Sequence, residues 1–216
     1  WLSHDNFFEM DPTLSRNGGP PERFDGESSA VVVSESIAFI GKAKRSKNPF
    51  LSVVWFGSPH EPYSGLKQDL ALYDDLPEAY AKKMVSLTSN ETGGRVKRPL
   101  RDVLRERYAE ITAMDRAIGM LRRYLKKEGL RENTLIWYCG DNGTPPSGIV
   151  VSPFRGMKGK MYEGGIRVPG VIEWPARITK PRFSKVNAVT SDMLPTLCAL
   201  AGQPLPKRPI DGVNLL

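Results

Sequence analysis

The sequence is poor in cysteine and histidine, with two of each among its 216 residues. Cys139 and Cys198 stand far apart, in apolar segments, and neither belongs to a Cys-x-x-Cys motif. This spacing argues against a zinc or dithiol centre, so we expect two buried free thiols, with a disulfide left open. His4 has no neighbouring motif and is interpreted as structural, with a place in a substrate pocket left open.

Long apolar runs are also absent. No stretch approaches the roughly 20 apolar residues of a membrane helix, so we predict no membrane span. The opening "WLSHDNFFEM" has neither the basic start nor the apolar block of an export signal. At 40% hydrophobic and 25% charged residues, the composition is typical of a soluble globular protein with one sizeable domain.

The formal net charge is +7, and the basic residues cluster in segments 42–47, 95–101 and 122–127. We expect these clusters to be solvated helix ends or loops. A positive field would also steer an anionic substrate toward the protein. The clusters have no zinc-finger spacing and no motif of stacking aromatics, so no nucleic-acid partner is predicted.

Hydrophobic spacing predicts three helices. The strongest covers residues 100–127, with Leu104, Ile111 and Leu125 on one apolar stripe and Gly129 as a stop. A second helix is expected to begin after Ser28 or Ser29 as N-cap and to end near residue 41, and a third covers residues 193–201.

Three short apolar runs, residues 50–56, 135–139 and 171–174, are typical of buried strands. Helices and strands follow one another in the order helix, strand, helix, strand, and this order predicts an α/β fold with a mostly parallel sheet and helices on both faces. In such sheets ligands bind at the carboxyl ends of the strands. Candidate site residues are therefore expected directly after these runs.

Two candidate ligands, Asp141 and Asn142, follow the second run in "CGDNG". A carboxylate and an amide carbonyl are hard oxygen ligands that suit Ca²⁺ or Mg²⁺, although Ca²⁺ takes six to eight ligands. The pair Asn-Gly is also a plain turn signal. The residue types alone leave both interpretations open.

Two more candidates lie in other loops. His60 follows the first run and stands between prolines in "SPHEPY". Lys158, Lys160 and Arg167 lie among glycines in "GMKGKMYEGGIRVPG", and glycines allow backbone and lysines to approach an anion closely. The Walker pattern is absent there, and an irregular surface loop is the alternative.

The order of these segments is more informative than any one of them. "PHEPY", "GDNG", "KGKMYEGGIRVPG" and the closing "DGVNLL" together resemble the formylglycine-dependent (type I) sulfatases of the alkaline-phosphatase superfamily. The resemblance covers most of the chain, from about residue 27 to its end. It implies a three-layer α/β/α sandwich, incomplete here at the N-terminal side.

The resemblance also implies roles for individual residues. Asp141 and Asn142 match the positions that bind the divalent cation, usually Ca²⁺ in preference to Mg²⁺. Lys158 matches the lysine that binds the sulfate group, and His60 the histidine that contacts the sulfate or the leaving oxygen. In this chemistry the cation and the lysine neutralise sulfate oxygens in the transition state.

Three features of the family pattern are not found in this sequence. Neither Cys139 nor Cys198 begins the C/S-x-P-S-R motif that yields the formylglycine nucleophile, and the Asp-Asp pair and the Lys-x-His segment of the family are not found. Residues 1–216 are thus expected to be the middle and C-terminal part of a sulfatase catalytic domain, with the small C-terminal subdomain largely absent. Glu163 and Arg167 are assigned to loop architecture.

The predicted function is sulfuric ester hydrolysis by the parent protein, on sulfated carbohydrates or aryl sulfates, with the isolated chain inactive. Two alternatives stay open: a non-catalytic relative that binds sulfated glycans, and a phosphodiesterase or phosphonate hydrolase of the same superfamily. Loops 1–25 and 64–99 are expected to set specificity. The family resemblance places the parent in the periplasm or outside the cell.

Overall fold

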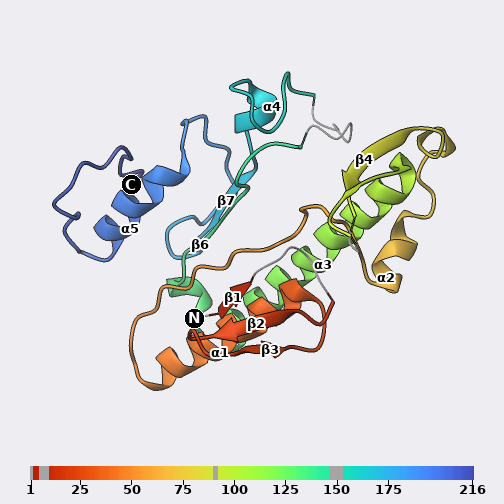
Figure 1. Ribbon diagram of the computed structural model, residues 1–216. Helices are drawn as coiled ribbons and strands as arrows, with labels where there is room; N and C mark the ends of the chain where they lie inside the picture. The colour runs from red at the N-terminus through yellow and green to blue at the C-terminus, as the bar shows by residue number, and fades with distance from the viewer. Residues whose placement is uncertain (1, 5–9, 90–91, 146–152) are drawn as a thin grey trace. The chain divides into compact units, whose positions relative to one another are not determined.

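The computed structural model describes residues 2–4, 10–89, 92–145 and 153–216, with side chains described from residue 10 onward. The chain divides into two compact units, Trp1–Arg177 and Ile178–Leu216, and each is described by itself. Figure 1 labels the helices and strands. In chain order the elements are β1 (Leu2–His4), β2 (Thr13–Arg16), β3 (Pro21–Arg23), α1 (Ser28–Arg45), α2 (Lys67–Leu70), η1 (Ala71–Tyr73), η2 (Glu78–Tyr80), β4 (Met84–Thr88), β5 (Arg95–Pro99), α3 (Leu100–Lys127), η3 (Arg131–Asn133), β6 (Ile136–Cys139), α4 (Glu163–Ile166), β7 (Gly170–Glu173), η4 (Thr190–Asp192) and α5 (Met193–Leu200).

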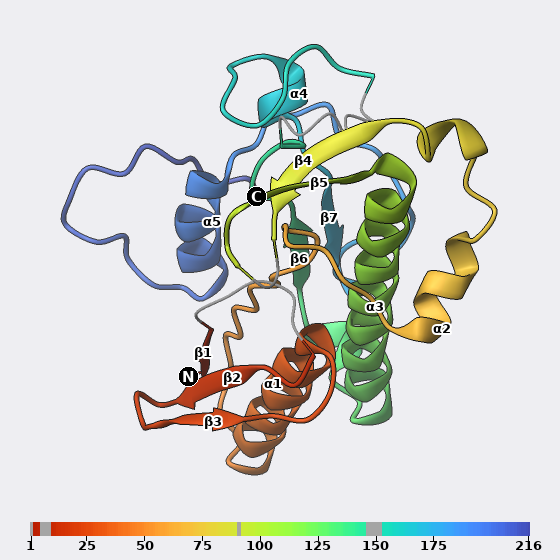
Figure 2. The same ribbon diagram turned by 45° about the vertical axis from the view of Figure 1, so that its right-hand side comes forward.

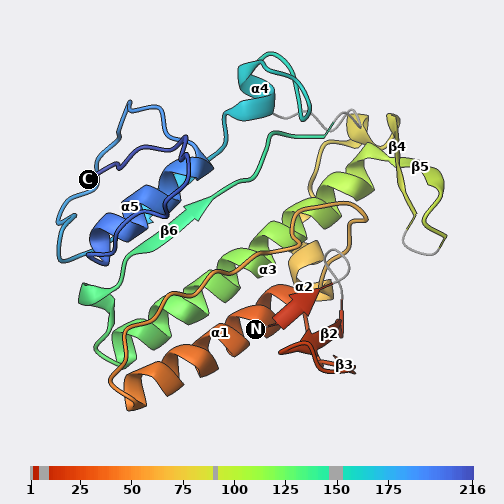
Figure 3. The same cartoon turned by 60° about the vertical axis from the view of Figure 1, so that its left-hand side comes forward.

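Helices α1 and α3 lie side by side and run in the same direction, as Figures 2 and 3 show. Their C-terminal ends meet, where Lys44 Nζ lies 2.7 Å from a carboxylate oxygen of Glu128. One turn earlier the contact is tight, because a Cβ on Gly41 would lie 2.8 Å from the hydroxyl oxygen of Tyr124. The predicted bounds of the 100–127 helix are confirmed.

The start of α1 differs from the prediction. Its N-cap is Glu27, whose carboxylate accepts hydrogen bonds from the backbone N–H groups of Ser29 and Ala30. The serines that the sequence favours as caps instead form the first turn, where both are buried. A buried carboxylate that binds two N–H groups satisfies the helix terminus as well as a serine hydroxyl would.

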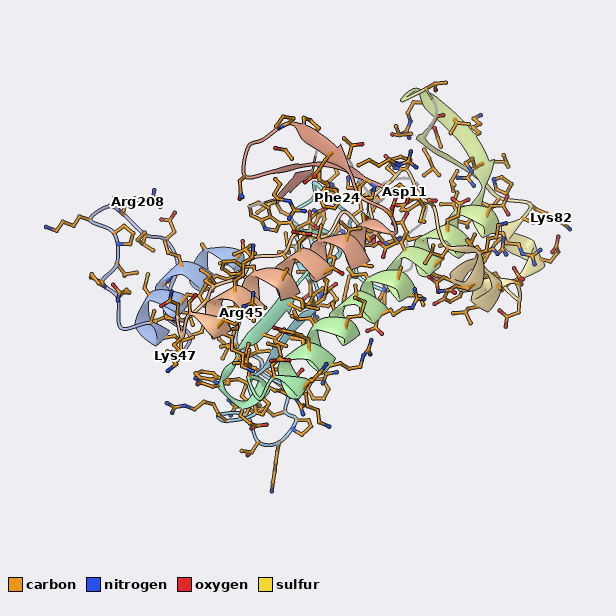
Figure 4. All side chains as sticks on the ribbon, turned by 90° about the horizontal axis from the view of Figure 1, so that it is seen from below. Asp11, Phe24, Arg45, Lys47, Lys82 and Arg208 are labelled. Carbon is orange, nitrogen blue, oxygen red and sulfur yellow. The ribbon has the colours of Figure 1, made fainter. Side chains whose placement is uncertain are left out.

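Two of the three basic clusters lie at helix ends, as expected, whereas segment 95–101 forms strand β5 and the start of α3. Lys42, Lys44 and Arg45 belong to the last turn of α1, and Lys126 and Lys127 to the last turn of α3. Positive charge at a helix C-terminus is favourable because the aligned peptide dipoles place partial negative charge there. Figure 4 labels Arg45 and, just past the helix, Lys47.

The first strands form a small antiparallel sheet in the order β1-β2-β3. Its centre is Leu14, which is 1% exposed. Side-chain contacts fasten the sheet: Arg23 pairs with Asp11 at 2.7 Å, and the Arg16 guanidinium lies 5.2 Å from the ring centroid of Phe24. Figure 4 labels Asp11 and Phe24.

The main apolar core lies between the β4–β5 hairpin and the first turns of α3. Its members are Tyr63, Val85, Leu87, Leu100, Val103 and Leu104. The buried face of α3 continues through Ala113 and Ala117 to Leu125, whereas Ile111 is 38% exposed. The predicted stripe was therefore wrong at Ile111, because small alanines rather than large apolar residues allow the close contact of α3 with its neighbours.

The predicted parallel pairing does not occur among the described residues. Strands β6 and β7 confirm two of the three expected strands, although β6 is half-buried and β7 mostly exposed rather than buried. They pair antiparallel from Ile136↔Glu173 to Cys139↔Gly170. Residues 50–56 are extended but join no sheet of the described chain. A strand needs a partner for its backbone groups. Here the segment is joined to α1 through side chains, by a 2.7 Å hydrogen bond between the Ser36 and Ser52 hydroxyls.

The C-terminal unit, Ile178–Leu216, is organised around α5, close to the predicted bounds of 193–201. The buried carboxylate of Asp192 accepts 2.8 Å hydrogen bonds from the backbone N–H groups of Val189 and Val213. These two bonds lower the pKa of Asp192. They also tie the closing residues of the chain to the start of the helix.

No helix in the described part of the chain combines the length and the apolar character that a membrane span needs.

Candidate active site

The first candidate feature is the turn after β6. The Asp141 carboxylate accepts a 2.8 Å hydrogen bond from the backbone N–H of Asn142 and a second, short one from the Asn142 side-chain amide. Asp141 is exposed and Asn142 is half-buried. The Asp141 carboxylate thus accepts both hydrogen bonds from Asn142 at a strand end, and the turn and ligand interpretations of "DNG" are compatible.

The lysine loop packs directly against this turn. The backbone N–H of Lys158 donates to the carbonyl oxygen of Thr144 at 2.8 Å, and that of Gly143 donates to Gly165 at 2.9 Å. A Cβ on Gly143 would lie 1.9 Å from the carbonyl oxygen of Gly164, so only glycine allows this approach. Figure 1 shows the short helix α4 of this loop beyond the ends of β6 and β7. The structure therefore brings Lys158 to the same strand end as the Asp-Asn pair.

The arginines and the glutamate of the loop contact one another or aromatic rings. The Arg155 guanidinium lies 4.0 Å from the ring centroid of Tyr162, and that of Arg167 lies 4.5 Å from the ring centroid of Phe154. Arg167 also pairs with Glu163 at 3.3 Å. These contacts agree with the architectural role assigned to Glu163 and Arg167.

Lys158 and Lys160 differ from those arginines. Both are exposed, and the ion pairs of the described residues include neither of them. The backbone N–H of Lys160 closes a tight turn onto Met157 at 2.9 Å. The loop thus carries two ammonium groups whose charge no described carboxylate neutralises, which suits an anionic ligand.

The donor set at the turn fits a hard cation only in part. Asp141 and Asn142 offer oxygen ligands, of which Ca²⁺ takes six to eight. Within residues 10–89, 92–145 and 153–216, no cluster of three or more His, Cys, Asp or Glu side chains has the arrangement of a metal site. The turn can therefore contribute two ligands to a larger set.

His60 belongs to a second loop, after the extended segment 50–56. Its backbone N–H donates to Gly57 at 3.0 Å, and its ring Nδ1 lies 2.6 Å from the carbonyl oxygen of Glu61. Because a carbonyl only accepts, Nδ1 carries a proton in this contact.

Contacts with three residues, Thr88, Arg95 and Ser29, hold the His60 loop to the surrounding elements. The Glu61 carboxylate accepts hydrogen bonds from the N–H and hydroxyl of Thr88 on β4, at 3.3 and 3.4 Å, and lies 3.6 Å from Arg95 on β5. At the other end of the loop, the hydroxyls of Ser58 and Ser29 are 3.5 Å apart. The loop is thus connected to the hairpin and to the start of α1.

Of the four predicted site residues, the described contacts bring together Asp141, Asn142 and Lys158. The position of His60 in the same site stays a prediction.

Both cysteines are free, as expected, but half-buried rather than buried. Sequence reasoning did not single out Glu110, a buried acid on α3. Its spacing was the available signal: Glu110 lies seven positions after Val103 and three before Ala113, which places it on the same buried face of the helix.

The sulfatase family model matches residues 2–203. The chain belongs to the sulfatase family. It is 31% identical over 201 residues to the ulvan-active sulfatase of Formosa agariphila, which covers 92% of this chain and 37% of the relative. It is 28% identical to the endo-4-O-sulfatase of Bacteroides thetaiotaomicron, over 94% of this chain and 39% of the relative.

Solved sulfatase structures are also similar. The crystal structure of Ps i-CgsB in complex with k-i-k-neocarrahexaose matches with a TM-score of 0.75 and 27% identity, over 94% of this chain and 40% of that one. The chain thus spans about two fifths of the length of these sulfatases. The predictions of the family and of the α/β class are confirmed. The assignment to the middle and C-terminal part of the catalytic domain stays a prediction.

Proposed function

We propose that the protein containing this sulfatase chain hydrolyses sulfate esters, and that Lys158, Asp141, Asn142 and His60 belong to its active site. The observation that carries the proposal is the 2.8 Å hydrogen bond from Lys158 N–H to Thr144, which fastens the lysine loop to the Asp-Asn turn. This backbone contact supports a site in which the Lys158 side chain and the oxygens of Asp141 and Asn142 act together. A sulfate group bound between a lysine and a metal ion needs this combination.

Lys158 is assigned to the sulfate oxygens. A sulfate ester is anionic, and charge on its oxygens changes as the S–O bond to the alcohol breaks. An ammonium group held near those oxygens stabilises the transition state electrostatically. The hydrogen bond of its backbone to Thr144 supplies the fixed position that such stabilisation requires.

Asp141 and Asn142 are assigned to a Ca²⁺ ion, in preference to Mg²⁺, through a carboxylate and an amide oxygen. When bound, the ion supplies further positive charge to the sulfate oxygens. Because these residues fill only two of the six to eight positions, the other ligands are proposed to come from the part of the parent protein outside residues 1–216.

His60 is assigned to the departing alcohol. The alcohol oxygen needs a proton when the ester bond breaks, and a histidine can donate one near neutral pH. Since Nδ1–H is held by Glu61 O at 2.6 Å, Nε2 is the donor in this assignment.

The nucleophile is proposed to be a formylglycine outside residues 1–216, since neither Cys139 nor Cys198 lies in a C/S-x-P-S-R motif. Without a nucleophile there is no covalent route. We therefore expect the isolated chain to be inactive. Turnover of an aryl sulfate by the purified chain with Ca²⁺ present, above the rate of a Lys158→Ala control, would contradict this expectation.

The substrate class is proposed to be sulfated carbohydrate, with small aryl sulfates as the alternative. The support is the names of the relatives, an ulvan-active sulfatase and a structure in complex with k-i-k-neocarrahexaose, together with the net charge of +7. Because such polysaccharides do not enter cells intact, we place the parent protein in the periplasm or outside the cell. Fractionation of cells that express the full-length gene tests that location.

The decisive experiment compares two lysines of one loop in the full-length protein. We expect Lys158→Ala to lower kcat/KM on an aryl sulfate and on sulfated oligosaccharides about 100-fold or more. The matched control Lys160→Ala, two residues away and equally exposed, should stay within a few-fold of wild type. Equal losses in both variants would refute the assignment of Lys158. Faster hydrolysis of phosphate diesters than of sulfate esters would point to the phosphodiesterase alternative.

A further inference from the structure

The His60 loop has an anchor that the proposed function does not use. Its last residue, Ser64, donates its backbone N–H to a carboxyl oxygen of Glu110 on α3 at 2.8 Å. Glu110 is 0% exposed and lies on the same helix face as Val103, Ala113 and Ala117, all buried. A long acidic side chain therefore occupies a core position and points its oxygen at this loop.

An acid at this position costs stability. Burial raises the pKa of Glu110 to about 9, and the nearby carboxylates of Glu106 and Glu27 add to the rise, whereas the Ser64 bond and Arg107 oppose it. Glu110 is therefore an uncharged acid at neutral pH. Its second oxygen is buried without a hydrogen-bond partner among the described residues. Since an apolar side chain would avoid this cost, the acid is better explained by the bond it makes.

The neighbours of Ser64 are held as firmly as Ser64 itself. Tyr63 is 1% exposed and belongs to the main core. A Cβ on Gly65 would lie 2.7 Å from Cβ of Ala109, so the backbone there is in close contact with α3. Only three residues separate Ser64 from His60, and the Glu61 carboxylate is bonded to Thr88.

We propose that Glu110 is a positioning residue for His60: by accepting the Ser64 N–H it fixes the C-terminal end of the loop, whose N-terminal end is fixed at Ser58. Between these ends the Glu61 carbonyl stays where it accepts the His60 Nδ1–H. Glu110 itself contacts no reacting atom. The catalytic part of the inference rests on the proposed function of His60, whereas the positioning part does not.

Two variants of one residue test the inference. Glu110→Gln keeps the length and an acceptor oxygen for Ser64, and Glu110→Met keeps the volume but has no acceptor. Asp69→Leu is the matched control, because Asp69 is also a buried acid, 1% exposed and paired with Arg116 of α3. It lies on α2, outside the His60 loop.

Two readouts separate positioning from stability. In the 216-residue chain, NMR of the imidazole nitrogens reports the tautomer of His60, assigned by comparison with His60→Ala, and the only other histidine is His4. In the full-length protein, kcat and KM are measured below the melting temperature of each variant. The NMR readout needs no catalysis, so it distinguishes failure of this inference from failure of the proposed function.

We expect Glu110→Gln to match wild type in both readouts. Glu110→Met should reduce the Nδ1–H tautomer of His60 and lower kcat about tenfold with KM within twofold, because a mispositioned proton donor slows the chemical step. Asp69→Leu should lower the melting temperature without changing the His60 signals. An unchanged His60 tautomer in Glu110→Met would overturn the inference. If Glu110→Met does not fold, Glu110→Ala is tested in its place. Failure of both to fold, while Glu110→Gln folds like wild type, would assign Glu110 to stability alone and also overturn the inference.

Discussion

The backbone nitrogen of Gly143 lies 2.9 Å from the carbonyl oxygen of Gly165, although 21 residues lie between them in the sequence. The contact joins the turn after β6 to the loop that carries Lys158. Each of the two segments taken alone would be an ordinary surface loop. Their backbone contacts bring the Asp141–Asn142 turn and the backbone of Lys158 to one strand end.

This contact predicts that Gly143 tolerates no side chain. A Cβ there would lie 1.9 Å from the carbonyl oxygen of Gly164, so Gly143→Ala must push the loop away from the turn. We expect a loss of about 1–3 kcal/mol in unfolding free energy, measured by urea denaturation, as is usual for overpacking. Gly170→Ala is the control, since a Cβ on Gly170 meets nothing within 4 Å. Similar losses in both variants would contradict the tight contact.

The Asp-Asn turn predicts weak binding of Ca²⁺ by the isolated chain. Two oxygen ligands are few, so we expect a Kd of about 1 mM or weaker by NMR titration, with shifts confined to the turn. Asp141→Asn should abolish these shifts because it removes the charged ligand. The neighbouring exposed acid Glu163 provides the control Glu163→Gln, which should bind like wild type. The same shifts in Asp141→Asn would exclude the turn as the binding site.

Glu110 predicts a specific dependence of stability on pH. Its pKa is about 9 in the folded chain against 4.5 as the ordinary value, so folding takes up a proton between these limits. Its contribution to stability is fully present below about pH 4.5 and is lost as the pH rises toward about 9. Glu110→Gln cannot titrate, so its advantage over wild type should grow with pH, by up to about 1.4 kcal/mol per unit. Denaturation at pH 5, 7 and 9 measures this difference, and a constant difference would contradict it.

The two faces of α3 predict opposite outcomes for two apolar truncations. Leu104 is 2% exposed in the main core, so Leu104→Ala should lower the unfolding free energy by about 2–5 kcal/mol. Ile111 is 38% exposed, and Ile111→Ala should cost less than about 1 kcal/mol. Thermal or urea denaturation of the two variants shows whether α3 presents the face of Leu104, and not that of Ile111, to the core.

Local patterns in the sequence predicted much of this fold. The bounds of α3 followed from the spacing of its apolar residues and from Gly129, and the segments that became β6, β7 and α5 were also identified. The pairing of strands could not be predicted in the same way. An apolar run such as residues 50–56 indicates a preference for extended backbone, but whether it joins a sheet depends on which other strand lies beside it.

The candidate site was predictable to the same extent. Asp141, Asn142 and Lys158 were predicted from the order of the segments and the family resemblance, and backbone contacts bring their segments together. The buried Glu110 was not found, because a glutamate in an amphipathic helix is usually assigned to the solvent face. Only its register, seven residues after Val103, places it in the core.

The extended segment 50–56 has a practical consequence. Its alternate side chains Leu51, Val53 and Trp55 are 65%, 64% and 84% exposed, and its backbone joins no sheet of the described chain. An apolar strand with an open edge recruits strands from other molecules. Preparations of the isolated chain should therefore self-associate as their concentration rises, in spite of the net charge of +7. A lysine in place of Val53 is the simplest remedy for anyone who needs the chain monomeric for spectroscopy.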